Sequence, residues 1–164
     1  MVDARAKAYG AAVAVVALDR ATKWLVEARF SFTDSRRVIP GFFDIIRSQN
    51  RGAAFGLFND SAFEWRTAVL IVISAVAIGL IGVMLWNARR MDGRMVAALA
   101  LILGGAAGNE IDRVVAGRVT DFLLFYVGRY EWPAFNVADS SIVIGCGLLL
   151  LDMLRPKRQA ANVS

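Results

Sequence analysis

The chain has 164 residues, of which 57% are hydrophobic, with a net charge of +5 and no histidine. This composition is typical of a membrane protein built as one domain, here residues 1–164. The basic residues are scattered around apolar segments without an aromatic-interleaved patch, which argues against nucleic-acid binding. A single cysteine, Cys146, excludes an intrachain disulfide, and the lack of histidine excludes the usual zinc site. Cys146 lies in an apolar run and is predicted to be a small packing residue.

Four stretches are long and apolar enough to be predicted as membrane-spanning helices. The first is followed by Asp19, Arg20 and Lys23 without a small-residue cleavage site, so it is interpreted as a retained span and not as a secretory signal. The second carries no charge, whereas the other two are interrupted by ionisable residues. The expected spans cover about residues 8–26, 67–86, 95–115 and 137–154.

Two connecting segments, 27–66 and 116–136, are expected on the extracytoplasmic side. The run 37–50, RVIPGFFDIIRSQN, mixes β-branched, aromatic and polar residues and predicts short strands or an interfacial hairpin. Its hydrophobic side chains, Phe42, Phe43, Ile45 and Ile46, are expected at the membrane surface. The second segment is predicted to be a loop, with Asp121 either on it or on an extended end of the third span.

The orientation follows from the basic residues in the short connections. Arginine and lysine outnumber acids in the N-terminal tail, in the link 87–94 and in the C-terminal tail, whereas the other segments mix both signs. The positive-inside rule therefore places both termini in the cytoplasm.

This orientation converts sequence position into depth in the bilayer. The polar residues of the first and third spans come late, and those of the fourth span come early, so they converge near the outer interface. A transporter would require polar groups at mid-depth, where none is predicted. A non-catalytic assembly or lipid-binding protein is the other alternative, and it would tolerate asparagine in place of the key carboxylates.

Asp121 and Asp139 are the candidate catalytic pair at this depth. Two close carboxylates cannot both ionise easily and share a proton, so one can activate water while the other protonates a leaving group. This chemistry hydrolyses a peptide without a metal or cofactor. A structural alternative exists, since Asn136 is a good helix N-cap and Asp139 suits the first helical turn, while Asp121 alone could be a solvated loop charge.

The remaining charges of the first and third spans are predicted to support the site. Asp19 and Lys23 have i, i+4 spacing, while Asn109, Asp112 and Arg113 share one helix face, with Asp112 and Arg113 expected as a charge cluster. Glu110 points about 100° away from Asn109. Gly104 and Gly108 form a G-x-x-x-G step that permits close helix packing.

Four blocks of the chain resemble the lipoprotein signal peptidases, the signal peptidase II family of bacterial membrane aspartic peptidases. These blocks occur in the order and spacing of the family over nearly the whole chain. They are LDRATKWLV in the first span, NRGAAFGLF at 50–58, GGAAGNEIDRVVAGRVTDF at 104–122 and PAFNVADSSIVIG at 133–145.

The resemblance implies an all-α membrane protein with four transmembrane helices, a small extracytoplasmic β-rich cradle and a periplasmic loop or helix. It implies a monomer in the bacterial cytoplasmic (inner) membrane, with its active site near the periplasmic face. The substrate would be a diacylglyceryl-modified prolipoprotein, cleaved before the lipidated cysteine. Membrane lipid would surround the protein, and globomycin would inhibit it. The dyad falls on Asp121 and Asp139. The other motif positions fall on Asp19, Lys23, Asn50, Gly52, Gly108, Asn109, Asp112, Arg113, Asn136 and Ala138.

Two residues depart from the commonest family pattern. Arg51 stands where a small or polar residue often follows the asparagine, and Glu110 stands where an apolar residue is usual. Neither belongs to the dyad, so the expected differences concern local electrostatics and the preference for substrate or inhibitor. Aspartic intramembrane peptidases of the presenilin or prepilin type carry a G-x-G-D motif, which GNEID does not match.

Overall fold

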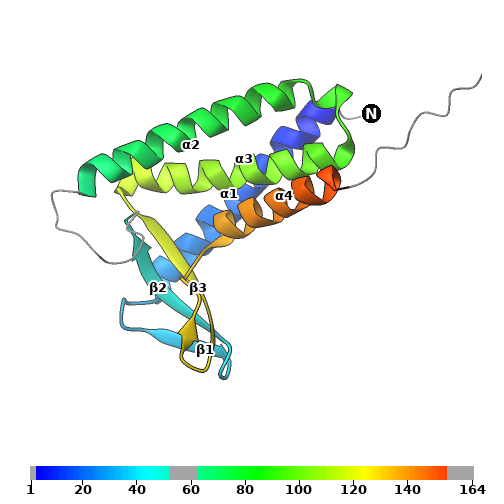
Figure 1. The fold of residues 1–164 in the computed structure, drawn as a ribbon. Helices are drawn as coiled ribbons and strands as arrows, with labels where there is room; N and C mark the ends of the chain where they lie inside the picture. The colour runs from blue at the N-terminus through cyan, green and yellow to red at the C-terminus, as the bar shows by residue number, and fades with distance from the viewer. Residues whose placement is uncertain (1–2, 52–62, 155–164) are drawn as a thin grey trace, which may run out of the picture.

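A computed structural model describes residues 3–51 and 63–154. Four long helices lie side by side, and a small sheet extends from one end of them, opposite the end that holds the N-terminus (Figure 1). The helices are α1 (Ala4–Arg29), α2 (Phe63–Trp86), α3 (Gly93–Ala116) and α4 (Val137–Met153). The predicted spans are thus confirmed as helices, with α1 longer at both ends than expected.

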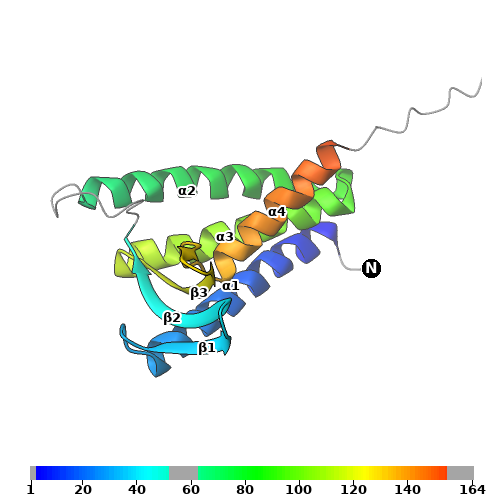
Figure 2. The same cartoon turned by 60° about the horizontal axis from the view of Figure 1, so that its bottom comes forward.

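Helix α3 is the centre of the bundle. It lies between α2 on one side and α1 and α4 on the other (Figures 1 and 2). Glycine permits this close packing: a Cβ atom at Gly104 would lie 2.7 Å from the carbonyl oxygen of Ala12 in α1. A Cβ atom at Gly105 would lie 2.3 Å from the carbonyl oxygen of Ala138 in α4. The G-x-x-x-G step therefore packs as predicted, and the adjacent Gly105 is a contact that the sequence analysis missed.

The outer faces of the helices are apolar. Exposed leucine, isoleucine and valine side chains occur on all four of them, for example Val13, Val76, Val114 and Val143. Two helical stretches, Thr67–Trp86 and Gly93–Ala116, are by length and composition able to cross a membrane. Cys146 is exposed on α4, so its prediction as a packing residue was wrong. The neighbouring Gly145 is the residue buried in the contact with α3.

The sheet has four antiparallel strands in the order β1 (Ser35–Ile39), β2 (Phe43–Asn50), β3 (Val119–Val127) and β4 (Tyr130–Glu131). The predicted hairpin at 37–50 is confirmed as β1 and β2. The prediction of a loop for the segment 116–136 was wrong, because β3 continues the sheet on β2 and pairs Asp121 with Ser48. Besides the long helices, the described residues contain a single 3-10 helix, η2 (Ala88–Arg90), between α2 and α3.

Candidate active site

The two candidate carboxylates meet at the N-terminus of α4, where one residue binds both. The side-chain amide of Asn136 donates to Asp121 Oδ1 at 2.7 Å, and its backbone N–H donates to Asp139 Oδ2 at 3.2 Å. Asp121 and Asn136 are almost fully buried, whereas Asp139 is half-buried. The structure therefore places the two carboxylates predicted from the sequence beside the same residue, and Asp139 is the more accessible of the two.

The local folding of two segments explains this meeting. Helix α3 ends at Ala116 and is capped by Gly117, whose φ of 66° is a left-handed conformation that favours glycine, and β3 then starts at Val119. Just before α4, Phe135 exchanges backbone hydrogen bonds with Leu123 of β3, with N···O distances of 2.8 and 3.1 Å. This bridge holds the start of α4 beside the strand that carries Asp121. Asp121 thus comes from a strand and not from the loop or helix end that was expected.

Asn136 and Asp139 also form a complete capping box. The side chain of Asn136 accepts from the backbone N–H of Asp139 at 3.0 Å, while the Asp139 carboxylate accepts from the backbone N–H of Asn136. The structural alternative, in which Asn136 and Asp139 cap the start of α4, is therefore correct. It does not compete with a chemical role, because each carboxylate oxygen can accept two hydrogen bonds, and Asp139 accepts one on Oδ2 from Asn136 and one on Oδ1 from Asn109 Nδ2 at 2.7 Å.

A buried ammonium group lies behind the pair. Lys23 Nζ is 2.7 Å from Asp19 Oδ2, 2.7 Å from Asp112 Oδ2 and 3.0 Å from Asn109 Oδ1. Because the ammonium group can only donate, it fixes the carbonyl oxygen of Asn109 toward itself and turns the NH₂ group toward Asp139. The i, i+4 pair predicted on the first span is confirmed.

Asp19 links this cluster to the end of α4. Its Oδ1 accepts from the backbone N–H of Ala138 at 2.9 Å, which satisfies one of the unpaired donors of the first helical turn. A Cβ atom at Gly108 would lie 2.8 Å from Asp19 Oδ2, and Ala138 is completely buried. Small residues at these two positions therefore give the Asp19 carboxylate its space.

The predicted cluster of Asp112 with Arg113 was not found. Asp112 instead pairs with Arg20 and Lys23 of α1, and Arg113, half-buried, lies within electrostatic range of Glu110. Arg20 is the site residue that the sequence analysis missed, although it lies three residues before Lys23 and so on nearly the same helix face.

The predicted asparagine at the end of β2 also reaches the pair, since the Asn50 side chain hydrogen-bonds Asp121. Gly52 and most of the NRGAAFGLF block lie outside the described residues.

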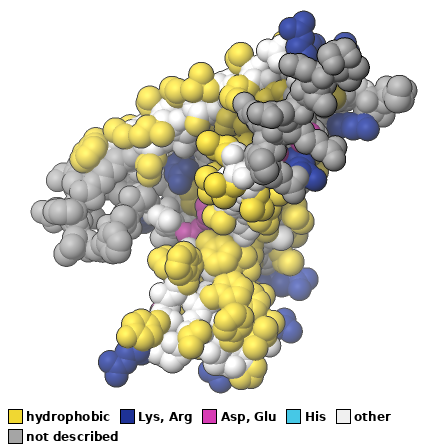
Figure 3. All heavy atoms as spheres, turned by 45° about the vertical axis from the view of Figure 1, so that its right-hand side comes forward, with side chains coloured by type: hydrophobic (Ala, Val, Ile, Leu, Met, Phe, Trp, Pro, Cys, Tyr) yellow, Lys and Arg dark blue, Asp and Glu magenta, His cyan; other side chains and the backbone are white. Residues whose placement is uncertain are grey.

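The environment of Asp121 favours its protonated form. Burial, followed by the charge of Asp139, raises the pKa of Asp121 from its ordinary value of 3.8 to about 6. Hydrogen bonds from Asn50 and Asn136 act in the opposite direction and are outweighed. Acidic atoms are visible among hydrophobic side chains where the helices meet the sheet (Figure 3).

An apolar hollow of about 460 Å³ begins at Asp139 and continues along the outer face of α4. Asp139 and Ser140 form its polar end. The remaining lining residues are aromatic or aliphatic: Trp132, Phe135, Val143 and Ile144. A substrate with an apolar group beside its reacting bond would fit a site of this kind.

A solved structure described as a bacterial membrane enzyme shares this fold, with a TM-score of 0.80 and 30% identity over 96% of this chain and 94% of that one. The protein is accordingly a membrane-embedded enzyme. The family model of signal peptidase (SPase) II matches residues 11–155. A lipoprotein signal peptidase of Solibacter usitatus (strain Ellin6076) is 60% identical over 164 residues and 100% of both chains. Another, of Nitratidesulfovibrio vulgaris (strain DP4), is 44% identical over 93% of each chain.

The chain belongs to the signal peptidase II family, the proteases that cleave signal peptides from prolipoproteins. The resemblance inferred from the four sequence blocks is therefore confirmed.

Proposed function

We propose that this protein removes the signal peptide from diacylglyceryl-modified prolipoproteins by cleaving before the lipidated cysteine, with Asp121 and Asp139 as its catalytic dyad. The observation that carries the proposal is the pair of carboxylates bound by Asn136, of which Asp139 lines the polar end of an apolar hollow. The hollow offers an apolar surface to the lipidated residue, and the carboxylates offer acid and base beside it.

The reaction needs one proton on the dyad. Asp139 accepts hydrogen bonds from Asn109 and Asn136 and lies in the first turn of α4, where a negative charge is favoured. Asp121 is the buried member, with its pKa raised to about 6, so we assign it the proton in the singly protonated dyad, which is the reactive form and a minority of the molecules at pH 7. Asp139 takes a proton from a water molecule as the water attacks the scissile carbonyl, and Asp121 donates to the developing oxyanion. Collapse of the tetrahedral intermediate breaks the C–N bond, and the proton on Asp139 passes to the leaving amine.

The other predicted site residues position these two groups. Asn109 and Asn136 hold the carboxylates directly, and Lys23, Asp19 and Asp112 fix Asn109 and the end of α4. Gly108 and Ala138 leave space for them. Asn50, Arg113 and Gly52 are assigned to the substrate backbone on the basis of their motif positions.

We further propose one integral membrane domain, residues 1–164, with all four helices spanning the bacterial inner membrane. Apolar side chains on the outer faces of α1 and α4 support spans beyond the two that qualify by composition. The positive-inside rule supports cytoplasmic termini, which puts the dyad near the periplasmic face. The protein is proposed to act as a monomer, surrounded by membrane lipid and inhibited by globomycin.

Cleavage of a lipidated prolipoprotein by the purified full chain in detergent tests the proposal. Asp121→Asn and Asp139→Asn should each lower the cleavage rate by about 10²–10⁴-fold. Asp152→Asn, at the other end of α4, is the matched control and should cleave at the wild-type rate. Globomycin should block the reaction, and a chelator should leave it unchanged. Wild-type cleavage by either dyad variant would overturn the assignment.

A further inference from the structure

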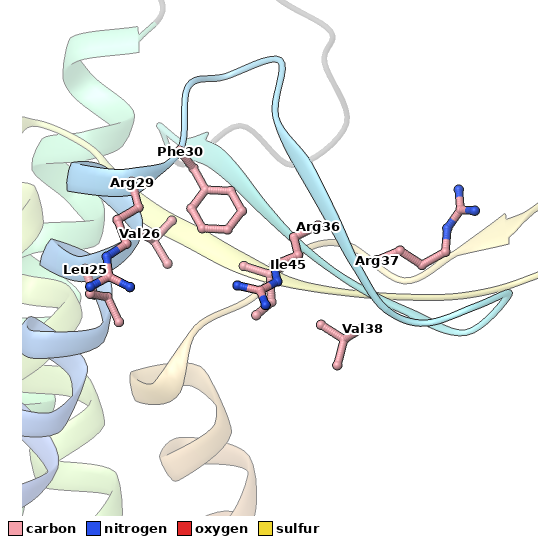
Figure 4. A pocket seen from close by; sticks show the side chains of 8 residues that line it. All are labelled: Leu25, Val26, Arg29, Phe30, Arg36, Arg37, Val38 and Ile45. Carbon is pink, nitrogen blue, oxygen red and sulfur yellow. The ribbon is translucent and has the colours of Figure 1, made fainter.

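A second hollow, of about 470 Å³, lies between the end of α1 and the β1–β2 hairpin (Figure 4). It shares no residue with the acidic site or with the hollow along α4. Its wall combines arginines with apolar side chains. The lining residues are Leu25, Val26, Arg29, Phe30, Arg36, Arg37, Val38 and Ile45.

Two of these arginines turn their charged groups to the same side. Figure 4 shows the guanidinium groups of Arg29 and Arg36 on the side of Leu25 and Ile45, whereas that of Arg37 points away from them. Arg36 and Arg37 are neighbours on β1, and successive side chains of a strand point to opposite faces. The hollow therefore presents two positive charges, while Arg37 lines it with the rest of its side chain and directs its single charge away.

Both charges are available to a ligand. Within residues 3–51 and 63–154, neither Arg29 nor Arg36 forms an ion pair or a side-chain hydrogen bond. The acids nearest in sequence are bound by other donors, namely Glu27 by a threonine hydroxyl group, Asp34 by a backbone amide group and Asp44 by two hydroxyl groups. An anion entering the hollow would thus meet unpaired guanidinium groups.

The end of α1 does not oppose an anion. The last carbonyl groups of a helix carry partial negative charge. Here Arg47 donates to the carbonyl oxygens of Glu27 and Phe30, at 3.2 and 3.0 Å, and compensates that charge from outside the hollow. Arg29 and Arg36 are therefore not needed to neutralise the helix end.

The rest of the hollow is apolar and accessible. Leu25 is 41% exposed and Val38 is 47% exposed, and Trp24 and Phe32, which follow the same stretch of chain without lining the hollow, are 67% and 58% exposed. Tryptophan and other aromatic residues in this setting are typical of the membrane–water interface. A ligand that satisfies both parts of the wall carries an anionic group on an apolar body.

We propose that this hollow binds an anionic phospholipid, with its phosphate on Arg29 and Arg36 and its acyl chains against Leu25 and Val38. Guanidinium groups match the geometry of phosphate oxygens. Phosphatidylglycerol fits better than phosphatidylcholine, because the acids near the hollow are already bound and none is left for a choline group. This site goes beyond peptide cleavage, since it recognises a bulk lipid of the membrane.

Native mass spectrometry of the full chain, titrated in detergent with phosphatidylglycerol or phosphatidylcholine, tests the site. The wild type should bind one phosphatidylglycerol preferentially. Arg29→Gln with Arg36→Gln should weaken that binding by roughly 30-fold, about fivefold for each basic residue. Arg37→Gln removes one positive charge that points away from the two guanidinium groups and keeps the aliphatic part of the side chain that lines the hollow, so it should bind as the wild type does. Both variants should unfold at the wild-type temperature, because the replaced groups have no partners to lose.

Three results would overturn the proposal. The double variant could keep the wild-type preference, or Arg37→Gln could lose as much affinity as the double variant, which would show an effect of net charge alone. Glycerol phosphate could displace the lipid at equal concentration, which would show a site for soluble anions.

The charge-conserving double variant Arg29→Lys with Arg36→Lys should retain part of the binding. If it loses all binding at an unchanged unfolding temperature, the binding depends on the two-pronged geometry of the guanidinium group and not on charge alone.

Discussion

Replacing Asp121 by asparagine should make the protein inactive and more stable at neutral pH. The folded state raises the pKa of this carboxyl group from 3.8 to about 6, chiefly through burial. Between those pH values the folded chain holds a proton that the unfolded chain has released. The free energy of unfolding therefore falls as the pH rises through this window. At pH 7 the folded protein bears the full cost of the ionised, buried Asp121 carboxylate.

The size of the effect follows from the shift. About two pKa units correspond to roughly 3 kcal/mol. The asparagine keeps an oxygen that can accept the 2.7 Å hydrogen bond from Asn136, so most of this gain should be realised. For a chain of 164 residues it amounts to an increase in Tm of roughly 6–12 °C as an upper limit.

Thermal unfolding of the wild type and of Asp121→Asn in detergent, recorded between pH 4 and pH 8, measures this difference. The Tm gap should be largest at pH 7 and should close toward pH 4, where the wild-type carboxyl group is protonated. Asp44→Asn is the control on the adjacent strand, and it should give no gain, because Asp44 is stabilised by hydroxyl donors of Ser35 and Tyr126. A gap that is absent, or that does not change with pH, would refute the reasoning.

Two further predictions concern the support of the site. Lys23→Met leaves two buried carboxylates without their ammonium partner and should lower the free energy of unfolding by about 3–5 kcal/mol, measured by denaturation in detergent. Gly105→Ala forces a Cβ atom to 2.3 Å from the carbonyl oxygen of Ala138 and should lower stability by about 1–3 kcal/mol together with the cleavage rate. Gly79→Ala, where the added atom meets nothing within 4 Å, is its control and should be at least as stable as the wild type.

The helices and the composition of the site could be predicted from the sequence because both depend on local patterns. Apolar runs of sufficient length mark the helices, and Asn136 three residues before Asp139 marks the start of α4. The i, i+4 spacing likewise predicts the ion pair of Lys23 with Asp19.

The pairings between elements could not be predicted in this way. Asp121 lies in a run that was interpreted as a loop, because its partner strand β2 is about seventy residues away in the chain and strand pairing depends on that partner. Asp112 was assigned to Arg113, its neighbour in sequence, whereas the packing of α1 on α3 supplies Arg20 and Lys23. The contact at Gly105 is a consequence of the same three-dimensional packing.

The charge balance of the cluster explains why the reactive form of the dyad should hold one proton, on Asp121. Two cations in contact with the cluster, Arg20 and Lys23, are already matched by the two carboxylates that they bind. Neutral amide groups are what bind Asp121 and Asp139. Amide donors support one negative charge. A second negative charge in a buried site requires a cation beside it, and without that cation one of the two carboxylates binds a proton. Half-buried Asp139 has access to solvent and buried Asp121 does not, so the single charge belongs on the carboxylate that water and substrate can reach.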